Sequence, residues 1–388
     1  LPPILDSIPK VTATDFEEYP EDDSPFWATI LQWLMTILGI LYFHKRDGYR
    51  IKDSCYWGRP LNAKKPNSKL FYKGDLNSEL CTPKPGLILT GPCIGPLPSI
   101  ARSCVHNEYL SLNNRALMAT PPPDEEFFQE AVGNAMNSHP IRKLLKTAAR
   151  RKAADIQITY DQWVSRFPPT RRKQLDKAKF DLTKSDDDTQ HLKDPLDMMI
   201  KREATMKRSF DPRTINIMTP EYQVITGPAV YEINTCMHLA WGLQEVRSDK
   251  LDVVTYAGGL NGEQVAEWNN ICIEMGLTAT GESDASRLDA HEHIHAIRAE
   301  HVLYERAQMH PRALSALRKQ LRFKGCSRHG VHFSGEATKP TGVNQTSVGN
   351  TFQTFVICKQ GVAYARAELD KDLPLVEYLV RYLIIGDM

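Results

Sequence analysis

The sequence predicts an α+β protein with more than one lobe, and three features of the chain support this fold class. At 388 residues it is long enough for two or three ordinary domains, or for one large multi-lobed domain. Its 41% hydrophobic and 24% charged content is that of a globular protein. Helical periodicity recurs in separate stretches, whereas the last stretch, VEYLVRYLIIGDM, has the apolar run of a buried strand.

The elements expected after the first 45 residues follow from local patterns. Residues 46–100 are rich in Pro, Gly, Lys and Asn, which predicts loops with an occasional short strand such as GLILT at 86–90. Apolar residues three and four apart then predict helices, and His310–Pro311 predicts a break in the helix expected at 291–321. These helices are expected over residues 125–136, 141–156, 262–275 and 291–321, and from the end of a glycine-rich segment at 325–350 to about Cys358.

The N-terminal segment, residues 1–45, contains a candidate membrane helix. Residues 26–43 run for eighteen positions without a charge, about the minimum that crosses a bilayer core of ~30 Å. Acids precede this run and HKRDGYRIK follows it, so the positive-inside rule places the rest of the chain in the cytoplasm. A buried helix is the alternative, because Thr29, Gln32 and Thr36 interrupt the apolar surface. The chain starts at Leu1 and ends at Met388, so we expect a fragment at both ends.

Charge and cysteine content limit the classes of function. The formal charge of +1 does not indicate a nucleic-acid binder, although basic residues cluster at 142–179 and 201–213, where solvated helix faces are the alternative. Eight cysteines without a CxxC pair indicate reduced intracellular thiols. The nearest approach to a metal-binding spacing is Cys326, His329 and His332, for which no fourth ligand is evident.

Carboxylates at two places suggest a metal site. In DASRLD, Asp284 and Asp289 are five residues apart, and a strand that turns into a helix between them would bring both into one cleft. Asp387, in IIGDM, follows an apolar strand and a turn glycine. Carboxylates from two adjacent strands can bridge a pair of Mg²⁺ ions ~3.5–4 Å apart, which is a geometry for nucleotidyl transfer.

Between these acids lies TGVNQTSVGNT, residues 341–351. Gly342 permits an irregular loop, and the four-residue step from Thr346 to Asn350 places a hydroxyl and an amide on one helix face. An amide paired with Asp289 could hold a ribose hydroxyl.

The order DASRLD, TGVNQTSVGNT, IIGDM resembles motifs A, B and C of the palm of viral RNA-dependent RNA polymerases. Upstream, IKREATMKRSFDPRTINIMTPEYQVITGP resembles motif F, and residues 90–117 and 167–178 look like fingers segments of tombusvirus-like and nodavirus-like replicases. The resemblance spans about residues 90–388. It implies a right-hand polymerase fold, with an N-terminal extension and fingers at 46–275 and an RRM-like antiparallel-sheet palm at 276–388. The palm would be truncated after motif C, with motifs D and E and the thumb missing.

The resemblance also implies roles for single residues. Asp284 and Asp387 would be the catalytic ligands of two Mg²⁺ (or Mn²⁺) ions, and Asp289 would sense the ribose 2′-OH with Asn350 as its partner. Gly342 and Thr346 would belong to the nucleotide-binding loop and helix. The motif F cations that would meet the incoming triphosphate are Lys201, Arg202, Lys207 and, foremost, Arg213.

The implied function is RNA-templated RNA synthesis from NTPs for a positive-strand RNA virus. The expected partners are template and nascent RNA, NTPs, an intracellular membrane bound through residues 26–43, and viral or host replicase subunits. The expected location is the host cytoplasm, on the cytoplasmic face of that membrane.

One position departs from the family pattern. The family usually reads GDD, and Met388 stands where the second acid belongs; a thioether is a poor ligand for a hard cation. We therefore expect weakened or metal-shifted activity, or a chain end that misrepresents the natural protein.

A non-catalytic palm-like RNA-binding protein is the main alternative. A zinc hydrolase built on His291, His293 and His295 is less favoured, as is a reverse transcriptase.

Overall fold

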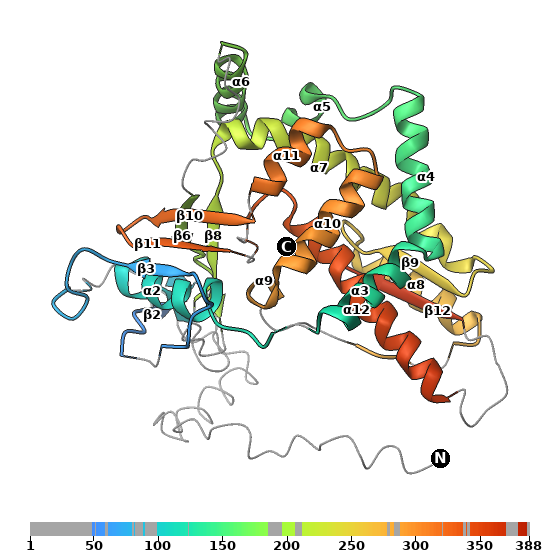
Figure 1. The fold of residues 1–388 in the computed structure, drawn as a ribbon, viewed down its shortest axis with the longest axis horizontal. Helices are drawn as coiled ribbons and strands as arrows, with labels where there is room; N and C mark the ends of the chain where they lie inside the picture. Colours follow the sequence, from blue (N-terminus) through green and yellow to red (C-terminus); the bar gives the residue numbers. More distant parts are fainter. Residues whose placement is uncertain are drawn as a thin grey trace, which may run out of the picture. The chain divides into compact units, whose positions relative to one another are not determined.

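The fold is described from a computed structural model of the chain (Figure 1). The described residues are 49–50, 52–58, 61–79, 81, 88–89, 99–122, 124–184, 196–205, 212–277, 280–282, 288–319, 321–336, 339, 342–369 and 379–385. The chain divides into two compact units. This division does not test the predicted boundary between fingers and palm at residue 275, which stays a prediction.

The smaller unit comprises Leu1–Asp53, Lys84–Ile100 and Ala204–Lys207. Its described strands are short. β1 (Tyr49–Arg50) pairs antiparallel with β4 (Ile88–Leu89), which confirms the expected strand at GLILT. β2 (Lys52–Ser54), β5 (Ser99–Ala101) and β7 (Ala204–Thr205) form a second small sheet, and the first two of these strands run one residue into the larger unit.

The larger unit contains a five-stranded sheet in the order β3-β11-β10-β6-β8. β10 runs parallel to β6, and the other neighbours are antiparallel. The hairpin of β10 and β11 lies in the segment where the sequence indicated only glycine-rich chain. In both strands exposed or half-buried residues alternate with buried ones, which is the period of a strand with one covered face. The strands are β3 (Lys69–Phe71), β6 (Leu196–Ile200), β8 (Thr214–Ile217), β10 (Arg322–Ser327) and β11 (His332–Glu336).

Helices make up most of the remaining structure of the larger unit. The predicted helices at 125–136 and 262–275 are confirmed, as is the break before Pro311, while the last helix extends well beyond Cys358. Side-chain caps help to define their starts: the Asp124 carboxylate accepts from the Phe127 amide, and Asn261 forms a capping box with Gln264. The helices are α2 (Val105–Ser111), η3 (Leu112–Ala116), α3 (Glu125–Met136), α4 (His139–Ala153), α5 (Tyr160–Val164), α6 (Pro169–Lys184), α7 (Pro220–Ala240), η5 (Leu243–Arg247), α8 (Gly262–Glu274), α9 (Leu288–His291), α10 (Ile294–Arg306), α11 (Pro311–Lys319) and α12 (Thr346–Leu369).

The predicted C-terminal strand is present as β12 (Val380–Ile384). It pairs in parallel with β9 (Asp252–Tyr256), so the described part of the C-terminal region contains a parallel pair where an antiparallel palm sheet was expected. The strand expected to end between Asp284 and Asp289 is not seen in the described residues 280–282, and residues 283–287 lie outside the described residues. The palm sheet as a whole stays a prediction. The Asp387 position follows closely after the described end of the chain at Ile385.

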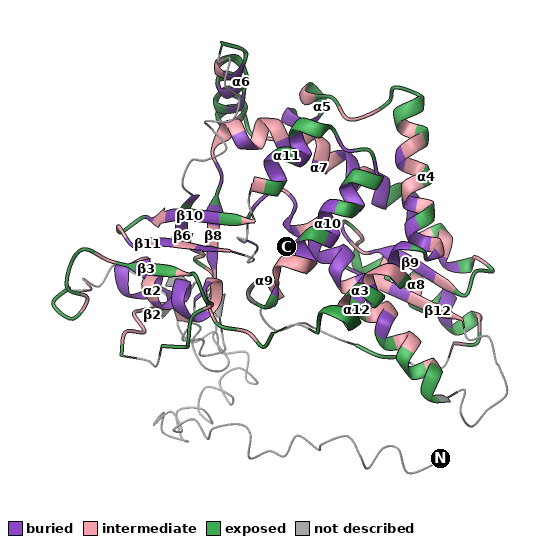
Figure 2. Cartoon of the chain, viewed as in Figure 1, coloured by how far each residue is buried: buried purple, intermediate pink, exposed green. Residues whose placement is uncertain are grey.

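The main core of the larger unit lies where α7, α10, α11 and α12 meet (Figure 2). Aromatic side chains fill it, and each of them is almost completely removed from water: Tyr222, Trp241, Tyr304, Phe352 and Phe355. Burying a side chain of this size contributes about 1.5–3 kcal/mol. This core therefore fixes the first turns of α12, which carry the predicted motif B residues.

Part of the basic cluster at 142–179 has a structural role. Arg151 of α4 donates to both carboxylate oxygens of Glu232 in α7, at 2.6 and 3.1 Å. Most other cations of α4 and α6 are exposed, as the alternative of solvated helix faces predicted, whereas Lys143 and Arg171 are half-buried. None of the helices formed by the described residues is both long and apolar enough to span a membrane. The candidate membrane helix at 26–43 lies outside the described residues.

Candidate active site

The loop before α12 has a conformation that only glycine adopts easily. Gly342 has a φ of +104°, in the left-handed region. It also lies against β8: a Cβ atom placed on it would come within 2.8 Å of the Asn216 carbonyl oxygen. This contact brings the predicted motif B loop beside the strand that directly follows Arg213.

Replacing Gly342 by alanine should therefore strain the loop. We expect the free energy of unfolding to fall by about 1–3 kcal/mol, since an unfavourable φ and a backbone clash coincide. Gly361→Ala is the matched control, because Gly361 lies in α12 with open space where its Cβ would be, and alanine favours a helix. Thermal unfolding of the two variants checks the prediction. It is wrong if both variants unfold at the wild-type midpoint.

Thr346 and Asn350 both lie in the first turns of α12, four residues apart, and both are buried. The Thr346 hydroxyl donates to the Val343 carbonyl at 2.9 Å, which closes the turn that leads from the loop into the helix. The Asn350 side-chain oxygen accepts a hydrogen bond from Lys339 Nζ at 2.8 Å. Lys339 thus orients the amide that the sequence predicts as a ribose contact.

Lys339 is the centre of a buried ionic cluster that the sequence reasoning missed. Its ammonium lies 2.7 Å from a Glu292 carboxylate oxygen and also donates to Glu300, and all three side chains are almost fully buried. Gln353 of α12 donates to the same Glu300 carboxylate. A Cβ on Gly349 would collide with Glu300, so this glycine lets α10 and α12 approach closely.

Electrostatics favour a charged Lys339. Burial alone would lower the pKa of its ammonium, but the carboxylates of Glu292 and Glu300 outweigh burial and raise this pKa above the usual value. Burial raises the pKa of Glu300, and the Lys339 charge opposes that rise. An ammonium held between two carboxylates in a dry environment has a nearly fixed position, so the Asn350 oxygen bound to it is fixed as well.

The same cluster connects to the predicted motif A segment. The helix predicted after Asp284 begins at Leu288, and Asp289 is the second residue of α9. Glu292 donates its backbone N–H to the Leu288 carbonyl and therefore continues this helical turn. The turn that carries Asp289 is thus linked through Glu292 and Lys339 to Asn350.

Three predicted site residues lie outside the described residues: Asp284, Asp387 and Lys207. The side chain of Asp289 is likewise not described.

Two of the predicted motif F cations lie together at the end of β6 and the start of β8. The Lys201 backbone N–H donates to the Arg213 carbonyl at 2.8 Å. Both side chains approach Glu203, at 2.9 Å for Lys201 Nζ and 3.8 Å for the Arg213 guanidinium, and each is about one-third exposed. Arg202, between them in sequence, is exposed. Ion pairs this accessible to water are weak, so a stronger anion can displace Glu203.

The histidines of HEHIH have separate partners. His295 Nε2 lies 2.9 Å from a Glu125 oxygen in α3, and His293 packs edge-on against Phe128. His291 ends α9 on the exposed side. The structure does not bring these three imidazoles together as a ligand set. Nor does it group Cys326 with the two nearby histidines, because His329 Nδ1 bonds instead to the buried Glu108 carboxylate at 2.7 Å.

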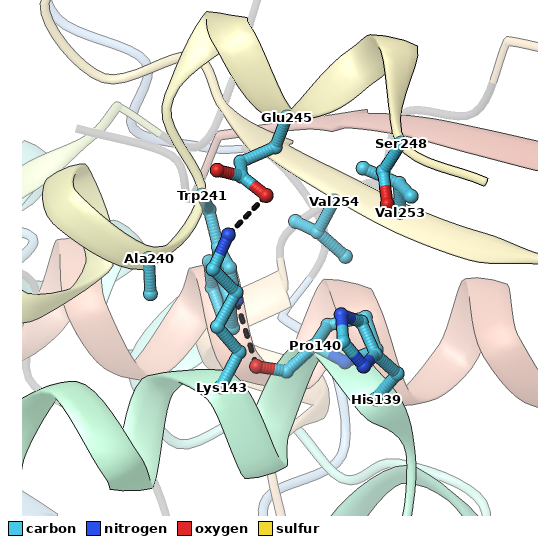
Figure 3. Close-up of a pocket in the computed structure, with 9 residues that line it drawn as sticks. All are labelled: His139, Pro140, Lys143, Ala240, Trp241, Glu245, Ser248, Val253 and Val254. Atoms are coloured by element: carbon cyan, nitrogen blue, oxygen red, sulfur yellow. Dashed lines mark hydrogen bonds and ion pairs between the residues drawn. The ribbon is translucent and has the colours of Figure 1, made fainter. Parts of the chain in front are cut away.

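A small cavity between α4, η5 and β9 lies among none of the predicted site residues (Figure 3). Lys143 forms an ion pair with Glu245 at its rim, and the Trp241 indole donates to the Pro140 carbonyl at 3.0 Å. Its volume of about 10 Å³ is roughly the room that one water molecule needs. It is far too small for a nucleotide.

Sequence signals for the missed residues exist but are weak. Lys339 stands three residues before Gly342, where a loop residue can reach the first turn of the following helix. Glu292 and Glu300 are eight residues apart, which is close to two helical turns and is compatible with one face. Neither spacing identifies a buried cluster without knowledge of which helices meet.

Comparison with known proteins gives a match to the part of the chain that contains most of the candidate site residues. A family model described as viral RNA dependent RNA polymerase matches residues 98–373, more than two thirds of the chain. The matched region contains the predicted motif F cations, Asp284, Asp289 and the loop and helix around Asn350. No match is found among curated proteins.

Proposed function

This chain belongs to the viral RNA-dependent RNA polymerases and is therefore an RNA-directed RNA polymerase, and we propose that it works by two-metal nucleotidyl transfer. We further propose that it is the catalytic subunit of a positive-strand RNA virus replicase of the tombusvirus-like or nodavirus-like kind. The observation that most supports a nucleotide site at this place is the Glu292–Lys339–Asn350 linkage, which joins the helical turn that carries Asp289 to the predicted motif B helix. The two metal ligands are proposed from the family and from the order of the motifs.

In the proposed reaction the 3′-hydroxyl of the growing RNA attacks the α-phosphate of an incoming NTP. The hydroxyl loses its proton to solvent, a new bond forms between this oxygen and the α-phosphorus, the bond to the bridging oxygen breaks, and pyrophosphate leaves. Two bound Mg²⁺ or Mn²⁺ ions would supply activation of the hydroxyl and charge stabilisation of the leaving group. Asp284 and Asp387 fit such ions because carboxylate oxygens are the donors that hard cations take, whereas the Met388 thioether is not.

Selection of ribose is the proposed role of Asp289 and Asn350. An amide whose oxygen is bound to Lys339 presents its N–H₂ group in a restricted direction, and a carboxylate on the linked helical turn can accept from a 2′-hydroxyl. Binding this hydroxyl would favour NTPs over dNTPs. Gly342 and Thr346 would shape the loop and first helical turn around the nascent base pair.

Recognition of the triphosphate is the proposed role of Lys201, Arg202, Lys207 and Arg213. Arg213 is the foremost candidate, because a guanidinium can contact two phosphate oxygens at once. Its weak pair with Glu203 at 3.8 Å would be replaced by the stronger pair with phosphate. Because β8 lies against the Gly342 loop, this exchange of Glu203 for phosphate would occur next to α12, the proposed nucleotide-binding helix.

Tethering to a membrane is proposed from the sequence of the N-terminal segment. The uncharged residues 26–43 followed by HKRDGYRIK would anchor the enzyme to an intracellular membrane with its catalytic part facing the host cytoplasm. Viral or host replicase subunits would be further partners at that surface.

The proposed function is tested by nucleotide incorporation in the natural full-length protein. With an RNA template, NTPs and Mg²⁺, we expect labelled product that depends on the template and disappears when EDTA removes the metal. dNTPs should be poor substrates. Binding of RNA with a steep salt dependence, but without metal-dependent incorporation, would instead support the non-catalytic RNA-binding alternative.

A further inference from the structure

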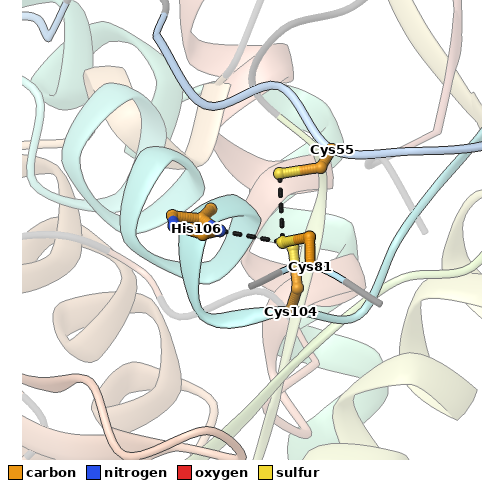
Figure 4. A group of neighbouring side chains, drawn as sticks. All are labelled: Cys55, Cys81, Cys104 and His106. Carbon is orange, nitrogen blue, oxygen red and sulfur yellow. Dashed lines mark hydrogen bonds between the residues drawn. The ribbon is translucent and has the colours of Figure 1, made fainter. Parts of the chain in front are cut away.

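Three thiols and one imidazole from distant parts of the chain come together in the larger unit (Figure 4). Cys55 follows β2, Cys81 lies in a loop, Cys104 is the N-cap residue of α2, and His106 lies in the first turn of that helix. Their possible ligand atoms all lie within 4.8 Å of one another. Among the residues that the structure describes, no other group of this kind is found.

The distances are close to those of a tetrahedral metal site. Cys81 Sγ is 3.4 Å from Cys55 Sγ and 2.8 Å from His106 Nδ1. With Zn–S bonds of ~2.3 Å and a Zn–N bond of ~2.0 Å, tetrahedral ligands lie about 3.5–3.8 Å apart. An outward movement of less than about 1 Å would therefore make room for an ion at the centre.

His106 is already oriented as a ligand. Its Nε2 lies 2.6 Å from the Leu76 carbonyl oxygen, which can only accept a hydrogen bond, so Nε2 carries the proton. In the neutral ring Nδ1 is then unprotonated and directs its lone pair at the Cys81 sulfur atom. A backbone carbonyl that fixes the second nitrogen is the usual support of a metal-bound histidine.

Hydrogen bonds that do not involve the thiols hold the same chain segments in place. The Asn107 side chain donates to the Ser54 and Arg102 carbonyls and accepts from the Tyr56 amide, at 2.8–3.0 Å. The Arg102 guanidinium donates to the Cys81 carbonyl at 2.8 Å. The backbone around all three cysteines is therefore positioned independently of any ion.

We propose that Cys55, Cys81, Cys104 and His106 bind one structural zinc ion that fixes the chain segments around Cys55 and Cys81 onto helix α2. Three thiolates and an imidazole suit zinc better than Mg²⁺ or Ca²⁺, which take oxygen ligands. Four protein ligands complete a tetrahedral shell and leave no position for substrate, which indicates a structural and not a catalytic ion. Among the described residues between the first two ligands, the single named strand is the short β3, so these segments gain most from such a cross-link.

The proposal is tested by metal analysis of the natural full-length protein purified without chelators. We expect about one zinc per chain, and Cys104→Ser and His106→Ala should each lose it. Cys326→Ser is the matched control, because Cys326 is also partly buried but lies outside the cluster. Zinc content is measured independently of polymerase activity. The zinc proposal can therefore fail while the proposed function holds, and the proposed function can fail while the protein binds zinc.

A second measurement uses wild-type protein, so it tests the proposal even if the two variants do not fold. Wild-type protein stripped by a chelator is titrated with Co²⁺, which should give the intense absorption of tetrahedral thiolate coordination, and Zn²⁺ should abolish this spectrum. No bound zinc and no such spectrum would overturn the proposal. So would a Cys55–Cys81 disulfide found by peptide mapping in protein isolated under alkylating conditions.

Discussion

Replacing Asp284 by asparagine in the natural full-length protein is expected to lower RNA-templated incorporation by about a thousandfold or more. The substitution keeps the size of the side chain but removes the negative charge that would hold the metal. Metal ions supply several kcal/mol of charge stabilisation in the transition state, and about 4 kcal/mol corresponds to a factor of roughly 1,000 in rate. RNA binding should be nearly unchanged, since a carboxylate repels phosphate and its loss removes no attraction for RNA.

The matched control for this experiment is Glu282→Gln. Glu282 is an exposed acid two residues before Asp284, so its change to an amide removes the same charge from the same segment. Steady-state incorporation should remain near the wild-type rate in this variant. The assignment of Asp284 fails if both variants behave alike, or if Asp284→Asn retains wild-type incorporation.

Much of the helical structure could be predicted from local pattern. Apolar residues at helical spacing identified α3, α8 and the α10–α11 pair, and Pro311 marked the break correctly because it cannot continue a preceding helix. The C-terminal strand β12 was identified by its apolar run. These elements have strong signals because their apolar residues recur at the spacing of one helix face or form one continuous run, although in α8 only Ile271 and Cys272 are buried.

The missed features depend on pairing between distant segments. The β10–β11 hairpin contains Gly325 and Gly335, which made the segment resemble a loop, although their lack of a side chain leaves room for Phe333 and Phe323 on the covered face. The cysteine cluster joins Cys55, Cys81 and Cys104, which are far apart in the sequence and form no CxxC pair. Only the folded chain brings such residues together.

The candidate site was predictable to the extent that its motifs are local. Gly342, Thr346 and Asn350 lie within nine residues, and the loop-to-helix transition expected there is present. The buried lysine that orients Asn350 was not predicted, because a lysine in a Pro-containing loop usually lies in water. Its burial results from two carboxylates that a different part of the chain supplies.

Replacing Lys339 by methionine is expected to destabilise the protein by about 3–5 kcal/mol. The change keeps an apolar stem of similar length, but it leaves the Glu292 and Glu300 carboxylates close together in a buried environment without a counter-charge. Thermal or denaturant unfolding measures the loss. Lys324→Met is the control, since Lys324 is exposed on β10 and its loss should change stability by at most about 0.5 kcal/mol.

The double variant Lys339→Met/Glu300→Gln separates the ionic role from simple packing. Removing one of the two uncompensated carboxylates should recover part of the lost stability, whereas Glu300→Gln alone should destabilise the wild-type protein. If the cluster also orients Asn350, the double variant should fold and still discriminate poorly between NTPs and dNTPs, because the amide oxygen has lost its donor. Full recovery of ribose discrimination in a folded double variant would separate the cluster from nucleotide selection and leave it a purely structural role.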